Sequence, residues 1–391
     1  MIDFSISPEM ERICTLTSRF MEEHVYPAER ETTEEGLPQE ILKRLQAKVK
    51  ELGLWAPHMP VEAGGMGIGV VGMGLMNEII GRSPIGPIIF GCQAPDAGNC
   101  EILHRYGTEE QKKRYLLPNV AGEIRSCFSM TEPEVSGADP TNLQTTAVLD
   151  DDRWVINGHK WFTTGAVGAA FAIVMAKTDP SAPPHKRFSM IIVPTDSPGF
   201  RIVRQVPVMG HTRHQGGHCE VRYENCRVPA RNLLGPRGEG FKIAQARLGP
   251  GRIQHCMRWL GVAQRSFELM CKYVLKREVF GTKLAEKQTI QNWIADSKAE
   301  MTAARLMTLY AAWKMDQKLD ARVEISLIKF FGAKVLHDVI DRAIQAHGAL
   351  GISGDTPLEM FYREARAARL YDGPDEVHRM VVARRILKEF Q

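Results

Sequence analysis

Asp372 lies immediately before the strongest chain break in the C-terminal part of the sequence. The stretch reads Asp372-Gly373-Pro374-Asp375-Glu376. Gly permits unusual backbone dihedrals and Pro lacks an N–H donor, so this pair predicts a bend. Two acids then follow in the first turn of a helix, where the helix dipole favours negative charge. We expect Asp372 between two helices, either as an ordinary turn residue or as a carboxylate at the mouth of a cavity.

A second polar segment follows strand-like residues near the middle of the chain. Phe128-Ser129-Met130-Thr131-Glu132-Pro133 leads into a loop that contains Ser136, Gly137, Asp139, Thr141 and Asn142. Hydroxyls and backbone amides in such a loop could bind a phosphate or the polar edge of a planar cofactor. A capped turn with no ligand is the alternative interpretation.

Several other motifs are weak on inspection. Residues 67–72 match GxGxxG, but the preceding segment carries Pro60 and Glu62 and is a poor buried strand, which disfavours a dinucleotide fold. His211, His214, His218 and Cys219 are metal ligands by type, yet their spacing fits no zinc pattern, so exposed or hydrogen-bonded loop histidines are the alternative. The sequence contains no HExxH, GxSxG or Walker A motif. We therefore predict no metal site.

Composition is that of an ordinary globular protein of 391 residues with a net charge of +4. This charge is too small and too evenly mixed with acids to favour nucleic-acid binding. The N-terminal segment does not resemble a signal peptide, and no apolar run reaches the length of a membrane span. The eight cysteines form no CxxC pair, which favours reduced thiols. These features predict a cytoplasmic protein with no membrane span.

Hydrophobic periodicity predicts a mainly α protein with a central β domain. Helical patterns fill residues 1–125, and short strand-like runs separated by turns fill residues 126–236. We expect the second region to form a small β-barrel or sandwich, with Asn157-Gly158 as its strongest hairpin turn. Residues 237–391 return to long apolar helical stripes over roughly 252–277, 286–317 and 321–346, which predict a four-helix bundle.

Several motifs, in order along the chain, resemble those of the acyl-CoA dehydrogenases. They are Gly64-Gly65-Met66-Gly67, Tyr106-Gly107-Thr108-Glu109-Glu110-Gln111-Lys112, Thr131-Glu132-Pro133, Asn157-Gly158-His159-Lys160-Trp161-Phe162-Thr163-Thr164-Gly165, Asn232-Leu233-Leu234-Gly235, Gly238-Glu239-Gly240-Phe241-Lys242 and Arg277-Glu278-Val279-Phe280-Gly281. The resemblance covers essentially the whole chain. Asp372-Gly373-Pro374 resembles the branch with an Asp base, which includes the vertebrate members ten and eleven; many other members carry Glu at this place.

The resemblance implies a flavoprotein of fatty acid metabolism and β-oxidation. Each three-domain subunit of a homotetramer, a dimer of dimers, would bind FAD. The enzyme would oxidise an acyl-CoA to the trans-2-enoyl-CoA and pass electrons to an electron-transferring flavoprotein.

The resemblance also assigns roles to individual residues. Asp372 would be the catalytic base, and the implied substrate contacts are Ser136, Arg252 and Gly373. The implied FAD contacts are Phe128, Met130, Thr131, Ser136, Phe162, Thr164, Arg277, Phe280, Gln288, Gln345, Gly348, Gly351, Pro374, Asp375 and Glu376. Arg277, Phe280 and Gln288 would reach FAD across a subunit boundary, and so would Gln345 and the turn Gly348-Ala349-Leu350-Gly351.

This chain departs from the family pattern at a few positions. Phe162 replaces the usual Trp beside the flavin, and the loop after Glu132-Pro133 is longer, which leaves the Ser role open between Ser136 and Gly137. Some members place the base near Gly251, where this chain has no carboxylate. A non-catalytic or heteromeric paralogue of the same fold, and an acyl-CoA oxidase that uses oxygen, are the alternative functions.

Overall fold

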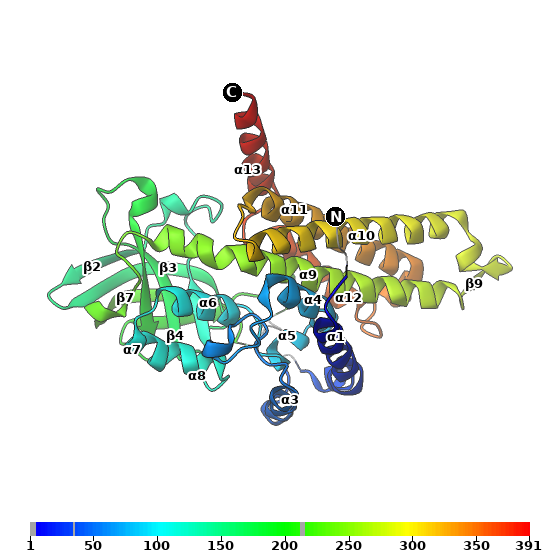
Figure 1. The fold of residues 1–391 in the computed structure, drawn as a ribbon, viewed down its shortest axis with the longest axis horizontal. Coiled ribbons are helices and arrows are strands. Elements are labelled where there is room, and N and C mark those ends of the chain that lie inside the picture. The colour runs from blue at the N-terminus through cyan, green and yellow to red at the C-terminus, as the bar shows by residue number, and fades with distance from the viewer. Residues whose placement is uncertain (1–4, 34–35, 212–215) are drawn as a thin grey trace. The chain divides into compact units, whose positions relative to one another are not determined.

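The computed structural model describes residues 5–33, 36–211 and 216–391. Helices come first, a β sheet occupies the middle of the chain, and long helices complete it (Figure 1). The predicted fold class is confirmed. Contacts divide the chain into two compact units. One comprises the chain up to Tyr26, Ile68–Pro87 and Arg252–Gln391, and the other comprises Pro27–Gly67 and Ile88–Gly251.

Short helices fill the N-terminal third, and their starts follow the predicted capping chemistry. The Ser7 hydroxyl accepts the Met10 N–H at the start of α1, and Thr108 and Gln111 form a reciprocal capping box. The elements are α1 Pro8–Phe20, η1 Met21–Val25, α2 Tyr26–Ala28, η2 Glu29–Glu31, α3 Gln39–Glu51, η3 Val61–Ala63, α4 Gly69–Ile80, α5 Gly86–Ile89, α6 Asp96–Tyr106, α7 Glu109–Gln111, η4 Lys112–Leu116 and α8 Leu117–Val120.

The Gly-rich loop that matches GxGxxG follows the 3₁₀ turn η3 and not a strand, so the dinucleotide interpretation fails as expected. A Cβ at Gly65 would lie 2.3 Å from the Met59 carbonyl oxygen, so close backbone packing explains this glycine.

Eight strands of the middle region form one sheet. The strands are β1 Ser126–Ser129, β2 Thr146–Asp150, β3 Arg153–Thr164, β4 Phe171–Lys177, β5 Phe188–Pro194, β6 Phe200–Gln205, β7 His218–Pro229 and β8 Leu233–Leu234, with η5 Pro140–Asn142, η6 Pro184–Lys186 and η7 Ala230–Asn232 between them. Their order is β6-β7-β3-β2-β4-β5-β8, and β1 pairs in parallel with β4. Trp154, Val174, Ile191 and Tyr223 belong to its core, which keeps the long strands β3 and β7 in a fixed register.

Long helices build the C-terminal region. They are α9 Gly240–Val274, α10 Gln288–Asp316, α11 Arg322–His347, α12 Leu358–Ala368 and α13 Asp375–Leu387, with β9 Glu278–Val279, β10 Thr282–Lys283, η8 Leu284–Glu286, η9 Gly348–Ile352 and η10 Lys388–Phe390 between or after them. Helices α9, α10, α11 and α12 share one core, to which they contribute Met257, Ala304, Ile328 and Phe361 respectively. Among the described residues, no helix combines the length and the apolar character needed to cross a membrane.

The predicted start of the first long helix was wrong. We expected it at Arg252, but α9 begins at Gly240 and contains Pro250. A proline inside a helix removes one hydrogen bond. The helix continues through it because buried residues lie on both sides of the proline, including Ile243 before it and Ile253 after it.

The predicted hairpin turn at Asn157-Gly158 was also wrong. Both residues lie inside β3, which runs on to Thr164, and the register against β7 shifts between Ile156 and Gly158. The Asn157 side-chain oxygen accepts the Asn225 N–H at 2.8 Å. A Cβ at Gly158 would lie 2.2 Å from Thr145 Oγ1. The glycine therefore serves a bulge and a close approach between segments, which a two-residue turn signal does not distinguish.

We predict that Gly158→Ala lowers the free energy of unfolding by about 1–3 kcal/mol, because the new methyl group overpacks the contact with Thr145. Thermal unfolding of the two proteins measures the change. Gly354→Ala is the matched control, since nothing lies within 4 Å of a Cβ built there. Equal melting temperatures for Gly158→Ala and the wild type would contradict the overpacking account.

Candidate active site

The turn between α12 and α13 holds Asp372 in an unusual backbone conformation. Asp372 has φ +55° and Gly373 has φ +101°. Asp tolerates the left-handed region better than most residues, and Gly enters it without steric cost. A Cβ at Gly373 would lie 2.8 Å from His378 Nε2, so this position also leaves room for the histidine ring.

Basic side chains from three helices hold the main chain of this turn. The Asp372 carbonyl oxygen accepts two hydrogen bonds from Arg252 on α9, from Nε at 3.0 Å and Nη2 at 2.9 Å. His378 Nε2 on α13 lies 3.1 Å from the same oxygen. Lys329 Nζ on α11 donates to the carbonyls of Ala368 at 2.7 Å and Gly373 at 3.2 Å. The conformation of Asp372 is therefore fixed by groups outside the turn.

The Asp372 carboxylate faces aromatic and basic neighbours. Its Oδ2 atom lies 3.4 Å from His255 Nε2, and 19% of the Asp372 side chain is exposed. The His255 ring stacks on Trp259 and lies against Tyr371, and Trp259 Nε1 donates to the Tyr371 hydroxyl at 2.7 Å. The carboxylate therefore lies beside an aromatic ring that is itself ionisable, and charged groups close to a carboxylate are a setting used for acid–base chemistry.

Two of the predicted substrate residues take part in building this turn. Arg252 directs its guanidinium at the main chain of Asp372, and Gly373 provides the turn conformation. Asp375, expected to contact FAD, has 1% exposed surface and an ion pair with Arg369 at 2.8 Å. Pro374 precedes α13 as its N-cap residue, and Glu376 is exposed in the first turn of that helix.

A buried ion pair between Lys160 and Glu132 stabilises the segment from Phe128 to Glu132. Lys160 on β3 is fully buried and donates to the Met130 carbonyl at 2.7 Å and to Glu132 at 2.8 Å. Burial lowers the pKa of Lys160 to about 8, while Glu132 acts in the opposite direction. The Trp161 N–H donates to the Thr131 carbonyl at 3.0 Å. These bonds fix Met130 and Thr131 beside β3.

The same edge of β3 carries the other residues expected to meet a flavin. Phe162 has φ +48° and is 40% exposed, and the Thr164 hydroxyl lies 2.9 Å from His218 Nδ1. The indole N–H of Trp161 is buried without a hydrogen-bond partner among the described residues. An exposed aromatic ring, a nearby hydroxyl and a free donor fit a planar cofactor that has acceptor atoms.

Ser136, whose role in the family pattern was left open, lies on an exposed loop. Its hydroxyl accepts the Ala138 N–H at 3.3 Å. His218 is the first residue of β7, and His211 precedes that strand in the chain. His214 lies outside the described residues. No cluster of three or more His, Cys, Asp or Glu side chains suited to a metal ion occurs in the described parts of the chain.

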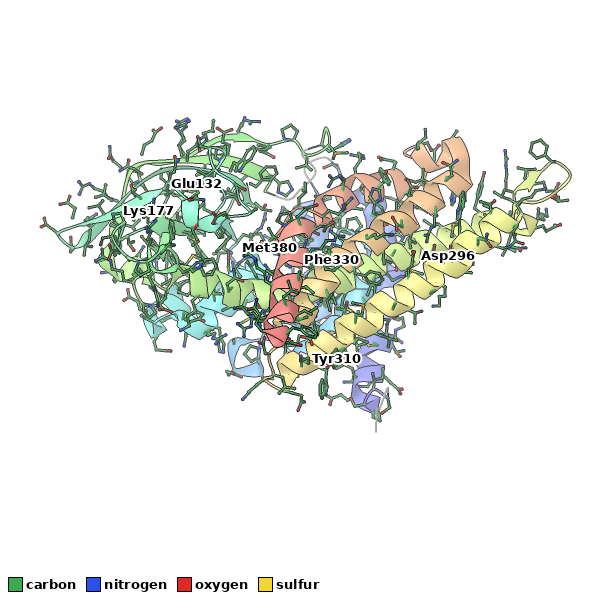
Figure 2. The ribbon with its side chains drawn as sticks, turned by 90° about the horizontal axis from the view of Figure 1, so that it is seen from above. Glu132, Lys177, Asp296, Tyr310, Phe330 and Met380 are labelled. Carbon is green, nitrogen blue, oxygen red and sulfur yellow. The ribbon has the colours of Figure 1, made fainter. Side chains whose placement is uncertain are left out.

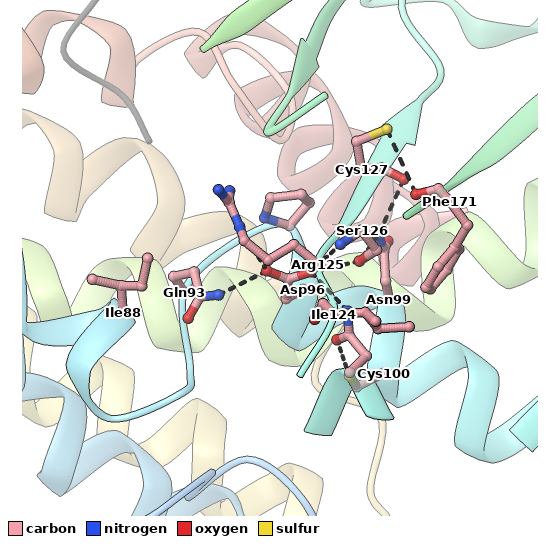
Figure 3. Close-up of polar contacts among 12 residues, drawn as sticks. Ile88, Gln93, Asp96, Asn99, Cys100, Ile124, Arg125, Ser126, Cys127 and Phe171 are labelled. Atoms are coloured by element: carbon pink, nitrogen blue, oxygen red, sulfur yellow. Dashed lines mark hydrogen bonds and ion pairs between the residues drawn. The ribbon is translucent and has the colours of Figure 1, made fainter. Parts of the chain in front are cut away.

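A buried polar network anchors the start of β1 (Figure 3). The Asp96 carboxylate accepts the Ser126 N–H at 2.6 Å, the Ser126 hydroxyl at 2.6 Å and Asn119 Nδ2 at 3.0 Å. Asn99 binds Ser126 and the Cys127 carbonyl, and the Arg247 guanidinium lies over the Phe128 ring. The sequence interpretation missed this network, since nothing in the local pattern links Asp96 to Ser126.

Six predicted FAD contacts of the C-terminal region lie close in sequence to one small core. This core, which includes Val274, Ile290, Ala346 and Leu358, joins the ends of α9 and α11 to the starts of α10 and α12. The exposed residues around it are Arg277, Phe280, Gln288, Gln345 and Gly348, while Gly351 is buried. Phe280, beside β9, is 99% exposed with φ +50°. A fully exposed phenylalanine at this place suits a contact outside the single chain.

The sequence interpretation did not single out His255, Lys329 or His378. All three contact the turn that carries Asp372, the leading candidate for the catalytic base. One signal was present: Arg252, His255 and Trp259 recur at the spacing of one helix face. Lys329 and His378 had no such signal, because only the packing of α11 and α13 brings them to the turn.

His378 generates a pH prediction. Burial lowers its pKa to about 4 from 6.5, and the positive charge of Arg252 acts in the same direction. The unfolded chain therefore binds a proton between these pH values that the folded chain does not. We expect unfolding free energy to be lost as pH falls from 6.5 towards 4, by at most about 3 kcal/mol.

Chemical denaturation across this pH range measures the loss. His378→Gln should reduce the slope, whereas the exposed His185→Gln should leave it unchanged. A wild-type slope retained in His378→Gln would contradict this assignment.

Comparison with family models identifies three consecutive matches. Residues 7–123 match the N-terminal domain of acyl-CoA dehydrogenases, residues 127–226 the middle domain and residues 238–387 the C-terminal domain.

Similar sequences bear related names. The chain is 46% identical to the Mycobacterium tuberculosis protein named as probable acyl-CoA dehydrogenase FadE2, over 98% of this chain and 96% of the relative. It is 44% identical to mouse acyl-CoA dehydrogenase family member 10 and 41% identical to mouse member 11. These matches cover 98% and 99% of this chain but 37% and 51% of the two mouse proteins. The chain thus spans about half or less of these longer relatives.

Solved structures agree with the sequence matches. A Mycobacterium abscessus chain assigned to the acyl-CoA dehydrogenases superposes with a TM-score of 0.96 at 40% identity, covering 99% of this chain and 100% of that one. Butyryl-CoA dehydrogenase from Megasphaera elsdenii gives 0.87 at 28% identity, with 99% and 100% coverage. This chain belongs to the acyl-CoA dehydrogenase family and is an FAD-dependent oxidoreductase.

Proposed function

We propose that the protein desaturates an acyl-CoA thioester between its α and β carbons, with Asp372 as the base. The observation that carries this proposal is the Asp372 carboxylate, held on a left-handed turn by three basic side chains that bind the main chain. Their hydrogen bonds bind carbonyls of the turn, and the carboxylate lies beside the His255 imidazole. A carboxylate displayed in this way can accept a proton from a bound substrate.

The reaction removes a weakly acidic α proton together with a hydride from the β carbon. FAD supplies the hydride acceptor when it is bound. Asp372 accepts the proton. Hydrogen bonds to the thioester carbonyl would stabilise the enolate charge that develops as the proton leaves. We assign this role in part to the main chain beside Asp372.

Asp is one methylene shorter than Glu, so this base reaches less far by about 1.5 Å, the length of one C–C bond. The substrate or the main chain at the turn must come closer by a similar distance. The left-handed conformation of Asp372, fixed by Arg252 and His378, is the feature we connect with this need. Arg252 remains our proposed substrate-side arginine, now with a defined part in holding the turn.

For FAD we propose three groups of contacts. The first comprises Phe128, Met130, Thr131, Ser136, Phe162 and Thr164. The second comprises Arg277, Phe280, Gln288, Gln345, Gly348 and Gly351. The third lies at the start of α13 and comprises Pro374, Asp375 and Glu376. The full exposure of Phe280 supports a contact of the second group with FAD bound to another subunit.

Assembly and partners complete the proposal. We propose a homotetramer of subunits with domains 1–125, 126–236 and 237–391, an electron-transferring flavoprotein as acceptor, and a reducing, cytoplasmic setting. Exposed aromatic side chains on α10 support assembly: Tyr310, labelled in Figure 2, is 53% exposed and stacks on Trp313, which is 47% exposed. None of the eight cysteines, all in the described part of the chain, forms a disulfide.

The central prediction concerns Asp372→Asn. The variant should bind FAD as the wild type does, but it should reduce FAD with an acyl-CoA about 10²–10⁴-fold more slowly, because an amide cannot accept the α proton. A screen of acyl-CoA chain lengths, read by bleaching of flavin absorbance in a single turnover, measures the rate. Bleaching of the flavin absorbance at the wild-type rate in Asp372→Asn would contradict the assignment of Asp372 as the base.

Asp355→Asn is the control for that variant. Asp355 lies on an exposed loop after η9, where its carboxylate contacts Ser353. The same assay separates the alternative functions. Purified protein that lacks FAD would favour a non-catalytic paralogue, and oxygen consumption without an added electron acceptor would favour an oxidase.

Phe280 provides a test of the contact between subunits. Phe280→Ser should release FAD more readily on dilution, since the apolar ring would no longer cover the cofactor of a neighbouring subunit. Flavin absorbance per chain and light scattering measure FAD content and assembly. Val61→Ser, at another exposed apolar residue, is the control. FAD retention equal to the wild type would refute this role of Phe280.

A further inference from the structure

One ionisable side chain at the Asp372 turn has no part in the function proposed above. His255 projects from α9 so that its Nε2 atom lies 3.4 Å from Asp372 Oδ2. The other basic groups at the turn, Arg252, Lys329 and His378, bind main-chain carbonyls. His255 differs from them because it contacts the carboxylate itself.

The position of the His255 ring is fixed by aromatic packing. Its centroid lies 6.2 Å from that of Trp259, with the planes inclined by 22°, and 4.9 Å from that of Tyr371. Trp259 and Tyr371 are joined by a hydrogen bond of 2.7 Å. The His255 side chain also keeps 20% of its surface exposed, so the imidazole can exchange protons with water.

We propose that His255 acts with Asp372 as a carboxylate–imidazole pair, in which the imidazole orients the carboxylate and then takes over the proton removed from the substrate. This inference rests on the proposed function. It makes His255 a positioning residue that acts through Asp372. A carboxylate one methylene shorter than Glu has less freedom to reach its target, and the imidazole limits the rotation that would turn it away.

The proton balance of the pair is simple. The α C–H bond breaks, its proton binds an Asp372 oxygen, and its electron pair forms the new C=C bond as the β hydride leaves for FAD. The proton then passes from Asp372 to neutral His255 Nε2, which leaves a carboxylate and an imidazolium. The imidazolium releases the proton to water, and the base is ready for another turnover.

Other groups near the pair affect its titration and enter the design of the test. They are Arg252, Cys256 and Arg258 on α9, Lys329 on α11, Tyr371 in the turn, and Asp375 and His378 on α13. A His378→Gln variant is therefore measured in parallel, so that an ionisation of His378 is not attributed to His255.

The test uses the FAD-loaded enzyme and the acyl-CoA that bleaches it fastest. His255→Phe keeps a ring against Trp259 and Tyr371, whereas His255→Gln keeps a polar group that does not titrate. We expect both variants to reduce FAD about tenfold or more slowly, with FAD content and enoyl-CoA affinity unchanged. We expect the pH profile of the rate to show two ionisations in the wild type and one fewer in both variants.

His337→Gln is the matched control. His337 is another half-buried helical histidine packed against a tyrosine, with its ring centroid 4.7 Å from that of Tyr362. It should keep the wild-type rate and both ionisations. The double variant Asp372→Asn/His255→Phe should be no slower than Asp372→Asn, because a residue that acts through Asp372 has no effect once the carboxylate is gone.

The possible outcomes distinguish a failure of the proposed function from a failure of the role proposed for His255. Normal bleaching in Asp372→Asn overturns the proposed function and this inference with it. A slow Asp372→Asn variant beside His255 variants of wild-type rate and pH profile overturns the inference alone. Additive losses in the double variant would do the same. A wild-type profile with a single ionisation overturns the inference without relying on any variant.

Discussion

Hydrogen bonds to the carbonyl oxygens of Asp372 and Gly373 are the interactions on which the candidate site depends. Arg252, Lys329 and His378 come from three different helices and meet at two adjacent peptide units. A hydrogen bond from a charged group such as Arg252 contributes about 1.5–3 kcal/mol, enough to offset the cost of a non-glycine residue at positive φ, about 1–3 kcal/mol. The packing of α9, α11 and α13 thus sets the direction of a single carboxylate. Figure 1 shows these helices together with α10 and α12 in the C-terminal region.

The sheet follows the same principle at the proposed flavin segment. Lys160 and Glu132 are both buried, and each binds main-chain groups as well as the other's charge: Lys160 the Met130 carbonyl, and Glu132 two N–H groups. Glu132, labelled in Figure 2, accepts two backbone N–H groups in addition to Lys160. A buried charge pair is costly unless its remaining hydrogen-bonding positions are filled. Here main-chain groups fill them, and one of these groups, the Met130 carbonyl, belongs to the segment that we propose for cofactor binding.

Local chemistry made part of this architecture predictable from the sequence. Helix caps at Ser7 and Thr108, the bend at Gly373-Pro374 and the alternation of helical and strand-like regions depend on neighbouring residues, and the structure confirms them. Asn157-Gly158 shows where that information ends. This dipeptide favours a turn, but Gly158 lies at a bulge where β3 pairs with β7. Likewise, Pro250 lies within α9 because burial on both sides supports the helix.

The chemical surroundings of Asp372 were harder to predict. The resemblance to the family singled out its carboxylate, yet nothing near it in sequence indicated Lys329 or His378. Only His255 shared a helical spacing with Arg252, and its meaning depended on where the loop after α12 comes to lie. The sequence therefore predicts the reacting group better than it predicts the groups that hold it and set its proton affinity.

The most direct test of Asp372 as the base is hydrogen exchange at the α carbon of the substrate. The FAD-loaded enzyme and an acyl-CoA that it binds are incubated in D₂O, and mass spectrometry follows the incorporation of deuterium. We predict exchange with the wild type and none above the uncatalysed background with Asp372→Asn that retains FAD. Equal exchange in the two proteins would contradict the central claim and place the base elsewhere in the chain.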